Sequence, residues 1–76
     1  MVQLQEAVST SRKFLLDVFE DEAKPSGLSL EGVELTEDMK FWLVTFSYWV
    51  GTTKTYKAVK LRAEDGIFIG IKNPYL

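Results

Sequence analysis

The sequence contains no cysteine and no histidine. Without cysteine the chain forms neither a disulfide nor a thiolate metal site, and its composition marks neither an oxidising nor a reducing compartment. Without histidine it lacks the commonest general base, the commonest metal ligand and the only side chain whose unperturbed pKa lies near neutrality. Catalysis that depends on either residue is therefore excluded.

Long apolar runs and an excess of either charge are also missing. No segment reaches the roughly 18 apolar residues of a membrane span, and the first residues lack the basic start and apolar stretch of a secretory signal. The expected location is the cytoplasm, although a domain cut from a longer precursor would look the same. With 9 basic and 11 acidic side chains, the net charge of −2 attracts neither nucleic acid nor an anionic membrane globally. Binding of either kind would need a local patch.

What is present is an ordinary globular composition, 46% hydrophobic and 26% charged over 76 residues, which predicts a single domain over residues 1–76. Apolar side chains recur with helical spacing over residues 3–23, and Pro25 and Gly27 follow as helix-ending signals. From Leu28 the apolar period becomes two. This alternation predicts strands at residues 28–37, 40–50, 55–63 and 67–72. The expected fold is α+β, with one N-terminal helix packed on one face of a four-stranded antiparallel meander, in the order α-β-β-β-β.

The turns between the strands decide which face each side chain takes. A tight turn at Asp38-Met39 pairs Val33 with Val44, and Gly32 sits at a slip in the apolar phase, which indicates a bulge. Leu35 pairs with Trp42 in the same register.

The two later hairpins are expected to have longer loops. A four-residue loop, GTTK at residues 51–54, pairs Val44 with Leu61. A three-residue loop at residues 64–66 pairs Leu61 with Ile69 and gathers the aliphatic side chains on one face. The expected core face is Val33, Leu35, Trp42, Val44, Phe46, Tyr48, Val59, Leu61, Ala63, Ile67, Ile69 and Ile71.

The same register leaves an open face rich in aromatic and basic side chains, fed largely by the segment FWLVTFSYW at residues 41–49. Trp49 and Tyr56 are expected to pair at one end of it. The candidate partner-binding residues on this face are Phe41, Leu43, Trp49, Tyr56, Lys60, Arg62 and Phe68.

Three interpretations of the open face stay available from the sequence. Aromatic side chains pack well across strands, with Lys and Arg stems lying over them, and need no function. Alternatively the face contacts a protein partner or a second copy, as in a homodimer. As a third interpretation, aromatic rings stack on single-stranded nucleic acid while Lys60, Arg62 and Lys72 contact phosphates. We expect a small non-enzymatic interaction or regulatory module, in which serine at both Phe41 and Phe68 lowers association and leaves the fold intact.

Candidate chemistry is sparse. The acidic pairs Glu37-Asp38 and Glu64-Asp65 would lie at one end of the sheet and could approach a cation. However, Asp and Glu are ordinary turn residues, and neither turn has the ligand spacing of a calcium loop. The serines and threonine at residues 9–11 have no histidine to activate them. We therefore expect no enzyme activity, no catalytic residue, no metal and no cofactor.

From Glu6 to Lys72 the order of features resembles the PepSY domain, a small helix-then-antiparallel-sheet module. The matching segments are Glu6-Ala7-Val8 in the helix, Trp42-Leu43-Val44 in an aromatic strand, Val59-Lys60-Leu61-Arg62-Ala63 in the next strand and Gly66-Ile67 at the closing turn. Arg62 stands where the family usually has aspartate. Other small α+β folds of the cystatin-like kind are similar as well. The resemblance implies a non-enzymatic module that binds or restrains a peptidase or another protein.

Overall fold

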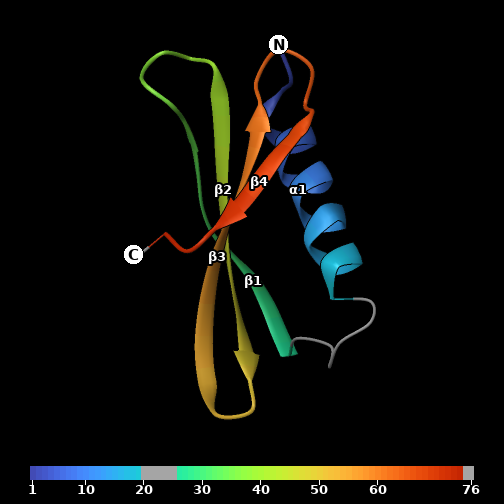
Figure 1. Cartoon of the computed structure of the whole chain (residues 1–76), viewed down its shortest axis with the longest axis vertical. Coiled ribbons are helices and arrows are strands. Elements are labelled where there is room, and N and C mark those ends of the chain that lie inside the picture. Colours follow the sequence, from blue (N-terminus) through green and yellow to red (C-terminus); the bar gives the residue numbers. More distant parts are fainter. Residues whose placement is uncertain (20–25, 75–76) are drawn as a thin grey trace.

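The computed structural model describes residues 1–19 and 26–74, and it has one helix followed by four strands (Figure 1). The elements are α1 (Leu4–Val18), β1 (Ser26–Leu35), β2 (Phe41–Val50), β3 (Thr53–Arg62) and β4 (Phe68–Lys72). The strands form one antiparallel sheet in the order β1-β2-β3-β4. The predicted α+β meander is therefore confirmed. The helix ends earlier than expected, and the rest of its expected span, after residue 19, lies outside the described residues.

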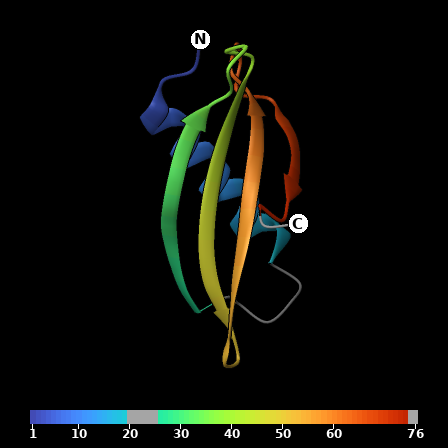
Figure 2. The ribbon, with the colours of Figure 1, turned by 90° about the vertical axis from the view of Figure 1, so that its left-hand side faces the viewer.

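Helix α1 covers one face of the sheet and leaves the other open (Figure 2). Ala7, Ser11 and Leu15 are buried at a spacing of four residues, which places them on one helix face toward the sheet. Leu16, on another side of the helix, is exposed. In the part of the chain that the structure describes, no helix is long and apolar enough to cross a bilayer.

Two aromatic contacts hold the second half of the helix on the sheet. The ring of Phe14 lies 4.8 Å from that of Phe68, and the ring of Phe19 lies edge-on to Tyr48 at 4.9 Å. Such pairs contribute about 0.5–1.5 kcal/mol each beyond the area they bury. Val18, four residues after Phe14, is 55% exposed.

The chain before the helix is tied to the same core. The Val2 N–H donates to the Ala63 carbonyl at 2.7 Å, and the Trp42 indole N–H donates to the Val2 carbonyl at 3.1 Å. The Val2 side chain is only 9% exposed, so it belongs to the core, a role that the sequence did not predict. These bonds fix where the helix starts over the sheet.

The first hairpin has the predicted register. Val33 pairs with Val44 and Leu35 with Trp42, and the pairing shifts between Leu30 and Gly32, so the bulge indicated by the glycine is present. A one-residue slip would have exchanged the two faces of β1. The connection itself is longer than the expected two-residue turn at Asp38-Met39: the Thr36 N–H donates to the Phe41 carbonyl at 2.9 Å and the Met39 N–H donates to the Thr36 carbonyl at 2.8 Å, so four residues, 37–40, join the strands. The register was therefore predicted correctly from the apolar alternation, although the turn was not.

The second hairpin is tighter than expected. Val50 pairs with Thr53 across a two-residue turn at Gly51-Thr52, so the expected four-residue loop is wrong. Gly51 has a φ of 61°, the left-handed conformation that primed hairpin turns require. Val44 consequently pairs with Val59 rather than Leu61. Because this shift is by two residues, the core face is unchanged and only the cross-strand neighbours differ.

The register of the third hairpin, between β3 and β4, differs most from the expected one. Val59 pairs with Ile71 as expected, but the register then slips so that Leu61 pairs with Phe68 instead of Ile69. The bulge turns Phe68 toward α1, where its ring meets Phe14. Ile67 and Ile69, both expected in the core, are 50% and 47% exposed. The ring of Phe68 therefore lies beneath the helix, where Ile67 and Ile69 were expected. The expected place of Phe68 on the open face is wrong.

Candidate protein interaction surfaces

The open face of the sheet, turned toward the viewer in Figure 2, carries most of the predicted site residues. Cross-strand pairing places Phe41 opposite Arg62 and Leu43 opposite Lys60. The expected pair of Trp49 with Tyr56 is wrong, because the tighter hairpin sets Trp49 opposite Lys54 and Tyr56 opposite Ser47. Phe68 lies on the other side of the sheet. Of the large apolar side chains on this face, Trp49 is substantially exposed, at 44%, whereas Phe41 and Leu43 are half-buried.

Three cations of the open face contact groups of the same chain. Lys60 Nζ lies 4.2 Å above the ring of Phe41, and Lys54 Nζ lies 5.6 Å from the ring of Tyr56. The Arg62 guanidinium holds Asp65 through three hydrogen bonds: Nε donates to the two carboxylate oxygens at 2.9 and 3.1 Å, and Nη2 donates to Oδ2 at 2.5 Å. This pairing raises the pKa of Arg62 and lowers the pKa of Asp65. The Arg62–Asp65 pair neutralises one positive charge of this face, whereas Lys72, opposite Ala58, is exposed.

The acidic turns have local roles. The Thr36 hydroxyl donates to Asp38 Oδ1 at 2.5 Å and the Lys40 N–H donates to the same atom at 3.1 Å. The Thr36 bond, followed by the Lys40 bond, lowers the pKa of Asp38. Asp65 likewise accepts from the Ile67 N–H at 3.1 Å. Within residues 1–19 and 26–74 no group of three or more potential metal ligands comes together.

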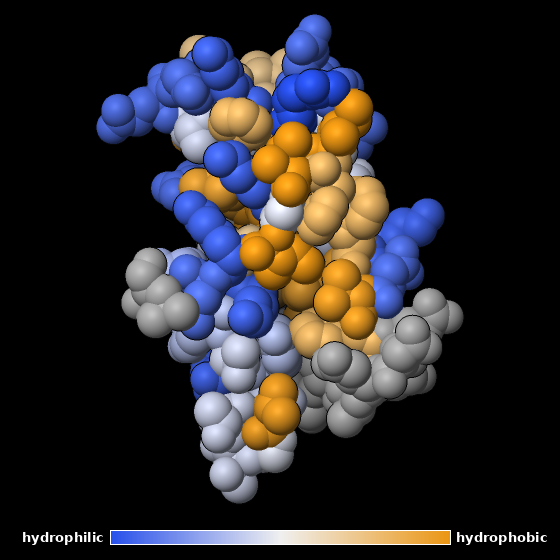
Figure 3. Space-filling model, in the orientation of Figure 1, coloured by the Kyte–Doolittle hydropathy of each residue, from blue (hydrophilic) through white to orange (hydrophobic). Residues whose placement is uncertain are grey.

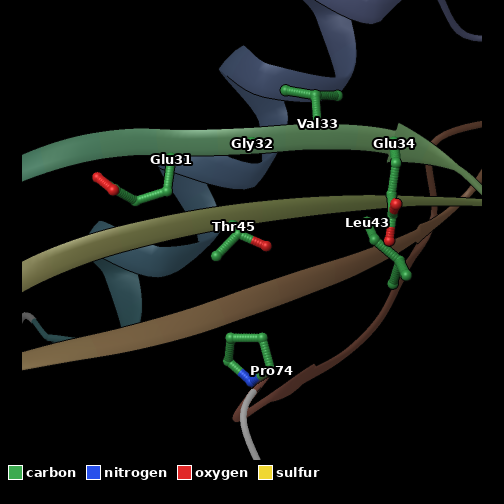
Figure 4. A pocket seen from close by; sticks show the side chains of 7 residues that line it. All are labelled: Glu31, Gly32, Val33, Glu34, Leu43, Thr45 and Pro74. Carbon is green, nitrogen blue, oxygen red and sulfur yellow. The ribbon is translucent and has the colours of Figure 1, made fainter.

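The segment after β4 turns over the open face. Figure 4 shows Pro74 standing over the sheet beside Thr45 and Leu43, at a hollow of about 290 Å³. Glu31 and Glu34 project from β1 along the same hollow. The residues that line it are Glu31, Gly32, Val33, Glu34, Leu43, Thr45 and Pro74. The middle of the open face is thus a shallow acidic-rimmed hollow bordered by the chain's own C-terminal segment.

An apolar surface lies apart from the open face, along the free edge of β4. Among the described residues β4 pairs only with β3, so its other side is an open edge of this sheet. Figure 3 shows apolar residues gathered in one continuous area over β4 and the neighbouring face of α1. We call this area the β4 edge surface. It consists of the exposed Val18, Ile67 and Ile69 with the partly buried Phe14, Phe68 and Ile71.

The sequence did not identify this surface, because it assigned Ile67 and Ile69 to the core. The sequence does contain one signal of this surface. The last strand of a meander is always an edge strand, and the segment IFIGI at residues 67–71 carries no charge to protect that edge.

The other edge strand, β1, is different. Glu31 and Glu34 stand on it, and its register shifts twice, after Ser26 and after Leu30. Charged residues and bulges are the devices by which edge strands avoid pairing with another chain. β1 carries two glutamates and two register shifts, whereas β4 has one register shift and one charge, Lys72 at its end, so β4 is the less protected edge.

Comparison with known proteins was made at three levels. No family model matches the chain, and no curated protein and no solved structure matches it at a significant level. The PepSY-like and cystatin-like resemblance stays a prediction from the sequence. What the chain does must be argued from its own geometry.

Proposed function

We propose that this chain is a small non-enzymatic protein-interaction module whose contact surface is the β4 edge surface. The observation that carries the proposal is an unpaired edge strand lined by exposed isoleucines. An edge strand presents a row of backbone N–H and C=O groups, and natural proteins block such rows with charges, proline or a covering segment. On β4 the only charge is Lys72, at its end. β4 has one register shift, beside Leu61, and Ile69 within it is 47% exposed.

The mode of contact that fits is strand addition, in which an extended segment of the partner pairs with β4. Backbone hydrogen bonds along the edge supply affinity, and the adjoining apolar side chains supply area and selectivity. Full burial of an isoleucine or valine is worth about 1.5–3 kcal/mol. Half-exposed Val18, Ile67 and Ile69 would together add about 3 kcal/mol, which is less than the cost of association. Apolar burial alone is therefore insufficient, and the backbone pairing is an essential part of the contact.

The open face has weaker support as the contact surface. Arg62 is held by Asp65, Lys60 lies on Phe41, and Pro74 stands over the middle of the face. The same contacts weaken the case for single-stranded nucleic acid, which needs exposed rings and available cations in one groove. A peptidase-restraining role rests on the PepSY resemblance, and an edge that captures extended segments is compatible with it.

The test is photo-cross-linking in cells that express the chain. A photoreactive amino acid replaces Ile69, on the proposed surface, or Trp49, on the open face. Leu30 is the matched control, because it is an apolar residue on the protected edge strand with nearly the same exposure, 48% against 47% for Ile69.

We expect cross-linked adducts at position 69 and few or none at positions 30 and 49. Adducts at position 49 alone would return the contact to the open face. If position 69 gives no more adducts than position 30, the β4 edge surface is not a contact site and the proposal fails.

A further inference from the structure

We propose that the strand that pairs with β4 is β4 of a second copy of this chain, in antiparallel orientation about a two-fold axis at Ile69. This inference rests on the proposed function, because it names the partner of the same surface. The product would be one continuous sheet across both copies. Since a two-fold axis normal to the sheet keeps its two faces distinct, both α1 helices would lie on the same side.

Charge is the first argument for self-pairing. β4 is preceded by the acidic turn residues Glu64 and Asp65 and ends at Lys72. Ile69 is equally distant in sequence from Gly66 and from Lys72. Antiparallel pairing about Ile69 therefore sets Lys72 of each copy opposite Gly66 of the other, next to its acidic turn.

Within that turn Asp65 is held by its own Arg62, and Glu64 is exposed, so Glu64 is the natural partner for the incoming Lys72. The two-fold axis produces this contact twice. A parallel arrangement would instead place Lys72 beside Lys72 and acidic turn beside acidic turn, which is unfavourable. The charge pattern of the edge thus complements itself in one orientation only.

Apolar burial is the second argument. The axis places Ile69 of one copy beside Ile69 of the other, and it brings together the two apolar areas that each extend from β4 onto α1 (Figure 3).

The test is sedimentation equilibrium over a wide concentration range, with circular dichroism to verify folding of each variant. We expect the wild-type chain to show a reversible monomer–dimer equilibrium. Lys72→Glu should weaken the dimer about tenfold, because two exposed ion pairs become repulsive. Lys54→Glu is the matched control, since it makes the same charge change on the β2–β3 hairpin and should leave the equilibrium unchanged.

The charge swap Glu64→Lys with Lys72→Glu should restore association, and Ile69→Lys should abolish it over the whole range. The charge variants keep the test decisive even if Ile69→Lys fails to fold, because Glu64 and Lys72 are exposed. A wild-type dimer that is indifferent to Lys72→Glu and to the swap would overturn the inference.

A wild-type chain that stays monomeric would overturn it as well. The cross-linking experiment tests the proposed function separately. Adducts at position 69 with a different protein would keep the edge as a contact site and reject only the second copy as its partner, whereas no adducts at position 69 would reject both.

Discussion

The bulge in the third hairpin makes a testable claim about two neighbouring residues, Phe68 and Ile69. In the structure Phe68 packs beneath α1 against Phe14, whereas Ile69 is 47% exposed at the edge of the sheet. Regular alternation along β4 would give the opposite arrangement. Replacing each residue by alanine therefore decides which of the two arrangements exists.

The magnitudes differ enough to measure. Truncating a fully buried phenylalanine to alanine lowers the free energy of unfolding by about 3–5 kcal/mol, and truncating a partly buried one lowers it by roughly half as much. Loss of the ring pair with Phe14 adds about 1 kcal/mol. We therefore expect Phe68→Ala to cost about 3 kcal/mol. For Ile69→Ala we expect less than about 1 kcal/mol, because that side chain is half in solvent and has little packing to lose.

The assay is urea unfolding monitored by tryptophan fluorescence, at a low protein concentration where self-association does not contribute. Trp42 is 9% exposed and tied to Val2, so its emission should report the loss of the core. A domain of this size has a total stability of about 4–11 kcal/mol. Phe68→Ala should accordingly remove a large share of it and lower the melting temperature by roughly 15 °C.

The reverse order would refute the bulge. If Ile69→Ala costs more than Phe68→Ala, then Ile69 is the core residue and the free edge is not apolar. The same result would remove the basis of the β4 edge surface. The structure also revises the expectation for serine at both Phe41 and Phe68, which should now unfold the domain through Phe68.

Further predictions concern the turns and the helix. Asp38 has a pKa lowered by the Thr36 hydroxyl, so its contribution to stability is complete above the ordinary carboxyl pKa of about 3.9 and is lost as pH falls through the lowered value. Urea midpoints between pH 6 and pH 2 should therefore fall less steeply in Asp38→Asn than in wild type. Ser11 is 0% exposed and its hydroxyl has no hydrogen-bond partner among the described residues, so Ser11→Ala should be neutral or stabilise by up to about 1 kcal/mol; a clear destabilisation would reveal a partner. Gly66 has a φ of 76° and a Cβ built there would lie 3.1 Å from Val2 Cγ2, whereas Gly51 has a φ of 61° and open space. Gly66→Ala should cost about 2 kcal/mol and Gly51→Ala about 1 kcal/mol in the same denaturation assay, and equal costs would mean that Val2 moves aside freely.

The sequence predicts the fold class well because local signals agree with the global arrangement. The buried face of α1 follows from its helical period, and the register of the first hairpin follows from the apolar alternation that pairs Val33 with Val44. Even the bulge at Gly32 is visible as a slip in the apolar phase. At these places propensity, period and turn chemistry indicate one answer.

The two errors of register have different physical causes. In the second hairpin GTTK contains no unambiguous turn signal, and the choice of a two-residue turn at Gly51-Thr52 shifts the register by two, which hides the error from any argument based on faces. Ile67, just before β4, and Phe68 and Ile69, which begin it, are all apolar, so alternation alone does not identify which side chain turns inward.

The packing of Phe14 against Phe68 makes that decision, and Phe14 is distant in sequence. The proposed contact surface could not be predicted for the same reason. The edge position of β4 follows from the meander, but the exposure of Ile69 depends on this one tertiary contact. Sequence reasoning therefore located the aromatic and basic open face and missed the apolar edge.

The most direct test of the central claim, that the free edge of β4 pairs with another strand, is amide hydrogen exchange of β4 as a function of protein concentration. Outward-facing amides of an unpaired edge exchange rapidly, and a partner strand protects them. We expect amides within Phe68–Lys72 to exchange markedly more slowly at high concentration, and amides of β1, the protected edge, to be unchanged. Exchange in β4 that is equally fast at all concentrations, or protection that develops on β1 instead, would contradict the claim.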